Sequence, residues 1–139
     1  MERRTSVADT GFVVALLNSS DPQHKTVVQI YAKQRSILLP QTVFAEVAYL
    51  VSRNASTSKL IDFLRGLSES RFQIEALQAQ DFLRVADILE EYTDSRIDFV
   101  DATVMAIAER YKITVILTLD RRDFSLFRPR HCDAFQLLP

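Results

Sequence analysis

The chain has 139 residues, of which 47% are hydrophobic and 25% charged, and its formal net charge is −1. This length and balance indicate one globular domain, over residues 1–139, with a hydrophobic core. The near-zero charge argues against a strongly basic nucleic-acid-binding module, although a nucleic-acid enzyme can combine an acidic site with a basic rim. Two glycines are too few for a glycine-rich phosphate loop, and one cysteine excludes a disulfide within the chain, which fits a reducing cytoplasm.

The first residues contain a basic pair followed by an apolar stretch, and both are features of signal peptides. However, Asp9 and Thr10 interrupt the apolar stretch, which is short and lacks a clean small-residue cleavage site. No other stretch is long enough to span a bilayer. We therefore expect a cytoplasmic protein with no membrane association.

Strand and helix patterns alternate along the chain. In chain order we expect strand 5–8, helix 10–18, helix 21–34, strand 36–39, helix 41–52, helix 58–67, strand 71–77, helix 79–92, helix 99–111, strand 114–119 and strand 133–138. Asp21 followed by Pro22 favours a helix start. The runs SILL and TVILTL are short, continuous and apolar, as is typical of buried parallel strands. The pattern predicts an α/β fold, a three-layer α/β/α sandwich with four or five mainly parallel strands.

Four acidic residues are each the single charge of an otherwise apolar segment, namely Asp9, Glu46, Asp101 and Asp120. A charged carboxylate is almost never fully buried unless it is paired or binds a metal. Asp9 and Asp120 directly follow expected strands, and the other two lie on helices that would pack against the sheet. Because ligands bind beyond the carboxyl ends of parallel strands, helices that point their acids toward those ends would bring all four together.

Four carboxylates in one apolar pocket need a proton or a cation. Two like charges about 4 Å apart repel by about 4 kcal/mol at an effective dielectric constant of ~20. Oxygen ligands without His or Cys favour Mg²⁺ or Mn²⁺ over zinc. Metal-assisted hydrolysis of a phosphodiester is the chemistry that fits such a site.

Each acid also has a purely structural interpretation. Asp9 and Asp120 could cap the helices that follow them, since Asp is a favoured N-cap residue. Asp101 lies in the first turn of its helix, where the helix dipole favours an anion. Glu46 is in the middle of a helix and could face solvent. Agreement among all four acids favours the shared metal site.

Several stretches match one protein family in order and spacing: ADTGFVVALLNSSDPQHK, FAEVAYLV, DFVDATVMAIAERYKITVILTLDRRDF and the final LLP. In these stretches the chain resembles PIN domains, and among them the VapC-type toxin ribonucleases of prokaryotic toxin–antitoxin pairs. The resemblance covers nearly the whole chain. Its most specific part is the last long block, an aspartate–alanine helix start followed by T-x-D-x-x-D/H-F. One departure is Gly11, where the family often has Ser or Asn.

The resemblance implies that Asp9, Glu46, Asp101 and Asp120 are the catalytic and metal-binding acids of a Mg²⁺- or Mn²⁺-dependent endoribonuclease. It also implies a homodimer and a cognate antitoxin protein that blocks the site. Substrates in the family include transfer and ribosomal RNA. The alternative is a catalytically silent PIN fold that binds protein or RNA. The four acids argue against it, because a binding module has no need of costly buried charges.

Other polar residues near the four acids have open roles. Asp123 could join the metal site or cap a helix. Asp98 could be the N-cap of the helix that carries Asp101, or support that acid indirectly. The hydroxyls of Thr10 and Thr118 could orient a metal-bound water or satisfy backbone groups.

Four arginines bracket the last acid in the sequence: Arg121, Arg122, Arg128 and Arg130. They could contact RNA phosphates at the rim of the site. Solvated loop arginines without a partner are the alternative for each of them.

Overall fold

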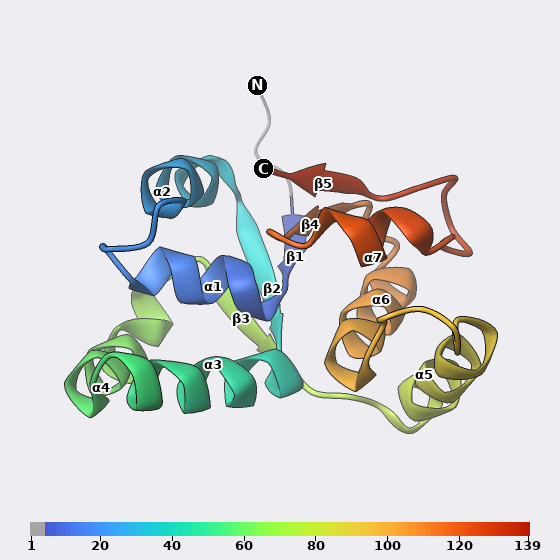
Figure 1. Ribbon diagram of the computed structural model, residues 1–139, viewed down its shortest axis with the longest axis horizontal. Coiled ribbons are helices and arrows are strands. Elements are labelled where there is room, and N and C mark those ends of the chain that lie inside the picture. Colours follow the sequence, from blue (N-terminus) through green and yellow to red (C-terminus); the bar gives the residue numbers. More distant parts are fainter. Residues whose placement is uncertain (1–4) are drawn as a thin grey trace.

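The computed structural model describes residues 5–139, so the basic pair ahead of the first strand lies outside the described residues. The elements, in order, are β1 (Thr5–Ala8), α1 (Thr10–Leu17), α2 (His24–Lys33), β2 (Ser36–Pro40), α3 (Gln41–Asn54), α4 (Thr57–Gly66), the 3-10 turn η1 (Leu67–Glu69), β3 (Phe72–Glu75), α5 (Ala79–Glu91), α6 (Phe99–Tyr111), β4 (Val115–Leu117), α7 (Arg121–Leu126) and β5 (Gln136–Leu138) (Figure 1). Within the described range, no helix combines the length and the apolar character that crossing a bilayer requires.

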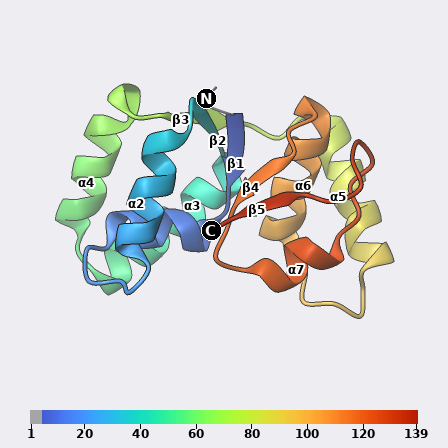
Figure 2. The same ribbon diagram turned by 90° about the horizontal axis from the view of Figure 1, so that it is seen from above.

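The five strands form one sheet in the order β3-β2-β1-β4-β5, and every neighbouring pair is parallel. Helices α1, α2 and α4 lie on one side of the sheet and α5, α6 and α7 on the other (Figures 1 and 2). The predicted three-layer α/β/α sandwich is therefore confirmed, and within residues 5–139 it has five strands and no antiparallel pair. The chain adds strands on one side of β1 first and then on the other, so the strand order reverses between β1 and β4, the position where open sheets of this kind bind ligands.

Helix α6 is buried along its middle, which explains its apolar sequence. Every residue from Ala102 to Ala108 is buried, and the helix packs on β1, β2 and α5. Those two strands contribute fully buried side chains such as Val7 of β1 and Leu39 of β2. A helix surrounded in this way cannot carry charges along its middle, which leaves its two ends for Asp101 and Arg110.

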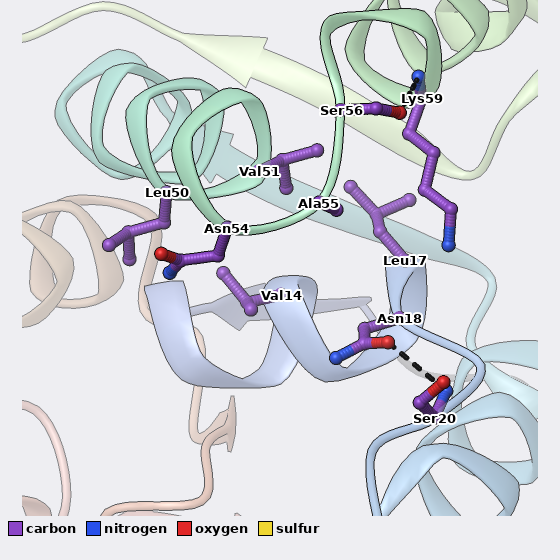
Figure 3. A pocket seen from close by; sticks show the side chains of 10 residues that line it. All are labelled: Val14, Leu17, Asn18, Ser20, Leu50, Val51, Asn54, Ala55, Ser56 and Lys59. Atoms are coloured by element: carbon purple, nitrogen blue, oxygen red, sulfur yellow. Dashed lines mark hydrogen bonds between the residues drawn. The ribbon is translucent and has the colours of Figure 1, made fainter.

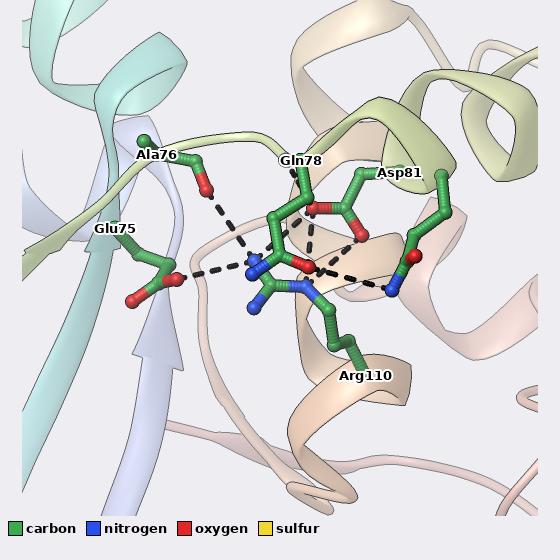
Figure 4. Close-up of polar contacts among 6 residues, drawn as sticks. Glu75, Ala76, Gln78, Asp81 and Arg110 are labelled. Carbon is green, nitrogen blue, oxygen red and sulfur yellow. Dashed lines mark hydrogen bonds and ion pairs between the residues drawn. The ribbon is translucent and has the colours of Figure 1, made fainter.

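A network of charges ties the C-terminal end of α6 to the start of α5 and the end of β3 (Figure 4). Arg110 Nε donates to both carboxylate oxygens of Asp81, each at 3.1 Å, and its Nη2 donates to Glu75 Oε1 at 3.1 Å. Asp81 is only 3% exposed, and its Oδ2 also accepts the backbone N–H of Gln78 at 2.8 Å. Because the buried carboxylate is paired and hydrogen-bonded, the network fixes α6 in place.

The predicted elements are observed, with shifted ends in several cases. Helix α2 begins at His24 rather than at Asp21, because the Asp21 carboxylate accepts the backbone N–H of Gln23 at 2.8 Å and closes a separate turn before the helix. The strands β3 and β5 are shorter than predicted. Helix α7 is the helix that the capping interpretation of Asp120 implies, but its six residues are too few to show a helical period in the sequence.

Candidate metal centre

Asp9 and Asp120 lie at the same edge of the sheet. Asp9 directly follows β1, and Asp120 comes three residues after the end of β4. The two strands pair in parallel with Ala8 opposite Leu117, and the Asp9 amide donates to the Leu117 carbonyl at 3.0 Å. Both acids are therefore beyond the carboxyl ends of the two central strands, where the strand order reverses.

Asp9 is buried, with 7% of its surface exposed. Its Oδ1 accepts the backbone N–H of Phe12 at 3.4 Å, and its Oδ2 accepts the hydroxyl of Thr118 at 2.6 Å. Burial raises the pKa of Asp9 to about 6, although the two hydrogen bonds oppose the rise, and the negative charge of Asp120 adds to it. Asp9 thus caps α1 and also contacts the segment after β4, so the capping interpretation and the site interpretation are compatible.

Thr118 links the two strand ends. Its hydroxyl is fully buried, donates to Asp9 and accepts the backbone N–H of Asp120 at 2.9 Å. The predicted role of satisfying a backbone group is therefore observed, and the same hydroxyl also holds the Asp9 carboxylate. The alternative, that Thr118 orients a metal-bound water, stays a prediction.

Asp101 lies in the first turn of α6 and takes part in a capping box. Asp98 is the N-cap: its Oδ1 accepts the Asp101 amide at 2.9 Å, and Asp101 Oδ2 accepts the Asp98 amide at 3.2 Å. Burial raises the pKa of Asp101 to about 8, and the negative charges of Asp98 and Asp9 raise it further, against the backbone hydrogen bond from Asp98. The predicted N-cap role of Asp98 is thus observed, and it orients the second acid.

Three carboxylates gather at this edge of the sheet. One oxygen each from Asp101, Asp120 and Asp123 lies within 4.8 Å of the others. Burial and the charge of Asp120 raise the pKa of Asp123. Within residues 5–139, none of the three forms an ion pair with a basic side chain. An all-oxygen set this close, without its own counter-charge, fits a hard divalent cation such as Mg²⁺ or Mn²⁺.

The N-cap of α7 is Asp120 rather than Asp123, because the Asp120 carboxylate accepts the backbone N–H of Asp123 at 3.4 Å. The predicted capping alternative for Asp123 is therefore not observed. The side chain of Asp123 joins the group of three, and it is buried.

Glu46 lies outside this group of three. It is half-buried on α3, and in the described part of the chain no hydrogen bond or ion pair reaches it. Thr42, one helical turn earlier, contacts Thr103 of α6 with 2.7 Å between their hydroxyl oxygens. Because residues four apart share a helix face, Glu46 lies on the face of α3 that approaches α6. Its part in the site stays a prediction.

The hydroxyl of Thr10 has no partner. It is buried at the first position of α1, and no hydrogen bond to it occurs among residues 5–139. The neighbouring Gly11 leaves space: a Cβ atom at that position would lie 3.9 Å from Asp9 Oδ1. A role of Thr10 beside the acids stays a prediction.

The four predicted RNA-contacting arginines differ in their partners. Arg121 donates to the carbonyls of Leu137 and Pro139, so it fastens α7 to the end of β5. Arg128 donates to the Ser125 carbonyl at 2.7 Å. The exposed Arg130 is 3.9 Å from Asp87. Of the four, Arg122 alone has no hydrogen bond or ion pair within the described range.

One residue that sequence reasoning missed is Arg96, in the loop between α5 and α6. With Arg122 and Asp123 it lines a pocket of about 380 Å³, and the charges of both arginines lower the pKa of Asp123 against the effect of burial. Its position two residues before the helix cap Asp98 was the available signal, but nothing in the sequence places that loop beside α7.

Another pocket, of about 440 Å³, lies between the end of α1 and the turn that joins α3 to α4 (Figure 3). Apolar side chains such as Val14 and Val51 line it together with Asn18, Asn54 and Lys59. This pocket contains none of the predicted site residues. The group of three carboxylates is therefore the better candidate for the functional site.

Comparisons with known proteins give a consistent family. A model described as "PIN domain" matches residues 6–128. Ribonuclease VapC26 of Mycobacterium tuberculosis is 31% identical over 134 residues, which cover 96% of this chain and 99% of that protein.

Two solved structures share the fold. VapC20 of Mycobacterium tuberculosis, described as a sarcin-ricin loop cleaving toxin, has a TM-score of 0.76 at 23% identity and covers 84% of this chain and 91% of its own. VapBC2 from Rickettsia felis, bound to a DNA fragment from its promoter, has a TM-score of 0.68 at 20% identity and covers 97% and 99%.

Proposed function

Because this chain belongs to the PIN domain family, we propose that it is a Mg²⁺- or Mn²⁺-dependent endoribonuclease, the toxin of a type II toxin–antitoxin system. The observation that carries the proposal is the group of three carboxylates, Asp101, Asp120 and Asp123, gathered without a basic partner beyond the strand ends. The ribonuclease name of a relative that is 31% identical supports RNA as the substrate.

In this proposal Asp101, Asp120 and Asp123 hold the cation, and Asp9 and Glu46 complete the acidic site. A divalent cation at this place supplies positive charge against the negative charge that develops on a phosphodiester during hydrolysis. The capping box with Asp98 fixes one ligand before any cation arrives. Such preorganisation matters because a ligand that must be oriented during binding lowers affinity and rate.

Thr118 orients the two acids that follow β1 and β4. Its hydroxyl holds Asp9 at 2.6 Å and receives the Asp120 amide at 2.9 Å, so the two acids keep a fixed relation. Asp9 is nine-tenths buried, which limits access of water to it. The chain thus brings its acids to the site already oriented.

We further propose that the RNA is of the transfer or ribosomal class, that a cognate antitoxin protein blocks the site, and that the chain acts in the cytoplasm as a homodimer. Three observations support the RNA class and the antitoxin, while the homodimer and the cytoplasm rest on the family resemblance. VapC20 is described as cleaving the sarcin-ricin loop, VapBC2 is an assembly bound to promoter DNA, and the chain resembles VapC-type toxins over nearly its full length.

The test is RNA cleavage by the purified chain, free of any partner, in Mg²⁺, Mn²⁺ or EDTA. We expect discrete products with either metal, none in EDTA, and a rate about a thousandfold lower for Asp101→Asn, a loss of about 4 kcal/mol in transition-state stabilisation. Asp62→Asn, at an exposed position of α4, is the matched control and should cleave like the wild type.

Two other outcomes have clear meanings. Equal cleavage by the wild type and Asp101→Asn would place the activity elsewhere. RNA binding by the wild type without cleavage in any metal would favour the catalytically silent binding module.

A further inference from the structure

The pocket beside the three-carboxylate group is lined by charged, aromatic and aliphatic side chains. It is about 380 Å³, lies between the α5–α6 loop and α7, and shares Asp123 with the three-carboxylate group. This volume is within the range of about 300–1,000 Å³ that small ligands occupy. The pocket is therefore continuous with the proposed reaction site and large enough for one unit of a polymer that extends beyond it.

Two arginines without protein partners line this pocket. In the described part of the chain, neither Arg96 nor Arg122 forms an ion pair or a hydrogen bond, and both are exposed. Among the charges that act on Asp123, these two are the positive ones. They are close enough to act on its carboxylate but do not bind it, which leaves their N–H donors available.

The lining of the pocket also includes apolar surface. Leu126 of α7 is 49% exposed, and Tyr92 at the end of α5 is held by a hydrogen bond from the Arg128 amide to its hydroxyl at 3.0 Å. The ring of Tyr92 also packs on Phe127 with 5.5 Å between ring centroids. A fixed aromatic and an exposed aliphatic side chain suit a sugar or base, while the arginines suit the phosphate attached to it.

The two exposed acids Glu91 and Asp94 also line the pocket. Arg122 directly precedes Asp123 in α7, and both arginines line the same pocket as Asp123. A phosphate bound by these arginines would lie beside the proposed cation site.

We propose that Arg96 and Arg122 hold the phosphodiester next to the one that is cleaved, with the attached nucleotide in the pocket walled by Tyr92 and Leu126. This proposal rests on the proposed ribonuclease function and assigns the path of the RNA strand through that same site. Both arginines are positioning residues. They bind the neighbouring phosphate, because guanidinium groups pair with phosphate oxygens through directed N–H donors, and so set which linkage lies over the carboxylates.

The first test compares Arg96→Gln and Arg122→Gln with the wild type on one short RNA. We expect KM to rise roughly tenfold for each variant, as for loss of one charged hydrogen bond, with kcat at saturating RNA nearly unchanged. The dependence of KM on salt should also weaken, because one phosphate contact is lost. Arg96→Lys should recover part of the loss, and Arg65→Gln, exposed on α4, is the matched control.

The second test replaces single phosphodiesters of that RNA, one at a time, by neutral methylphosphonates. In the wild type, neutralising the linkage adjacent to the cleaved one should raise KM roughly tenfold. In the double variant Arg96→Gln/Arg122→Gln the same replacement should have little further effect, because both contacts to that phosphate are already gone. Full additivity of the two changes would overturn the proposal.

The outcomes separate this proposal from the ribonuclease function. If the wild type cleaves RNA and both glutamine variants keep its KM, the arginines have no such role and the ribonuclease function stands. If the wild type cleaves nothing in Mg²⁺ or Mn²⁺, both fail. RNA binding by Asp101→Asn, with and without Arg96→Gln, repeats the comparison without turnover, and equal affinities would contradict the proposal.

Discussion

The two ends of helix α6 carry buried charge in opposite ways. At its C-terminal end, Arg110 donates to Asp81 and Glu75 at 3.1 Å, so each buried charge has a partner (Figure 4). At its N-terminal end, Asp101 lies within 4.8 Å of two further carboxylates, and no basic side chain of the described residues pairs with any of them. The same fold therefore satisfies its acids at one end and leaves the counter-charge to come from outside at the other.

The difference has opposite effects on stability. A buried ion pair that also has its hydrogen bonds satisfied fixes one arrangement of the helices, and removing one partner is costly. Unpaired carboxylates destabilise the folded chain when they ionise. The raised pKa values of Asp101, about 8, and Asp9, about 6, reflect this cost. One end of α6 thus contributes to the fold, and the other retains unpaired carboxylates whose repulsion a bound cation would relieve.

The largest expected effect on stability comes from Asp81→Asn. It should lower the free energy of unfolding by about 2–3 kcal/mol, somewhat less than usual for a buried pair, because Arg110 keeps Glu75. Asp101→Asn should leave stability unchanged or raise it, although it removes activity. Urea unfolding in EDTA measures both, and Asp87→Asn, exposed on α5, is the control. A loss in Asp101→Asn as large as in Asp81→Asn would mean that the two ends do not differ.

The pH dependence of stability sharpens the same comparison. Asp101 and Asp9 have raised pKa values in the folded chain, of about 8 and about 6, so the folded state binds more protons than the unfolded state above about pH 4. In EDTA, the Tm of the wild type should therefore fall as the pH rises from 4 to 8. Asp101→Asn should flatten the part of the curve between pH 6 and 8.

Adding Mg²⁺ at pH 8 is the complementary arm of that experiment. A cation bound to the ionised carboxylates should restore the Tm of the wild type, by an amount that grows with the ratio of free metal to Kd. A Tm in EDTA that changes by the same amount between pH 6 and 8 in the wild type and Asp101→Asn would contradict the assignment.

The smallest expected effect is that of Thr118→Val. The variant loses the 2.6 Å hydrogen bond to Asp9, and since that bond lowers the pKa of Asp9, the pKa should rise further. We expect cleavage to slow roughly tenfold near neutral pH, with the acidic limb of the pH–rate profile shifted upward. Thr118→Ser keeps the hydroxyl and should retain the wild-type profile. An unshifted profile in Thr118→Val would show that the hydroxyl matters only to the backbone.

Local rules in the sequence predicted much of this arrangement. The continuous apolar runs predicted parallel strands, which are observed. The acids that follow two of these strands lie at one edge of the sheet, as expected. Asp98 is the N-cap of α6, as its position before that helix indicated. Each of these inferences depends on neighbouring residues or on a general property of parallel sheets.

Contacts between distant segments were beyond the reach of such rules. Nothing local shows that Asp123 joins the oxygen group while Glu46 stays outside it, since that depends on how α3 and α7 are placed. Arg121 resembles a free surface arginine in the sequence, but it is fastened to β5. Arg96 was missed for the same reason, because its loop meets α7 only in the folded chain.

The measurement that tests the central claim most directly is calorimetric titration of Mn²⁺ into the metal-free chain near neutral pH. If the acids at the N-terminal end of α6 await a cation, the wild type and Asp62→Asn should bind Mn²⁺ alike, and Asp101→Asn should bind it at least about tenfold more weakly. Equal affinity in all three proteins, or no binding by the wild type, would show that these carboxylates only cap helices.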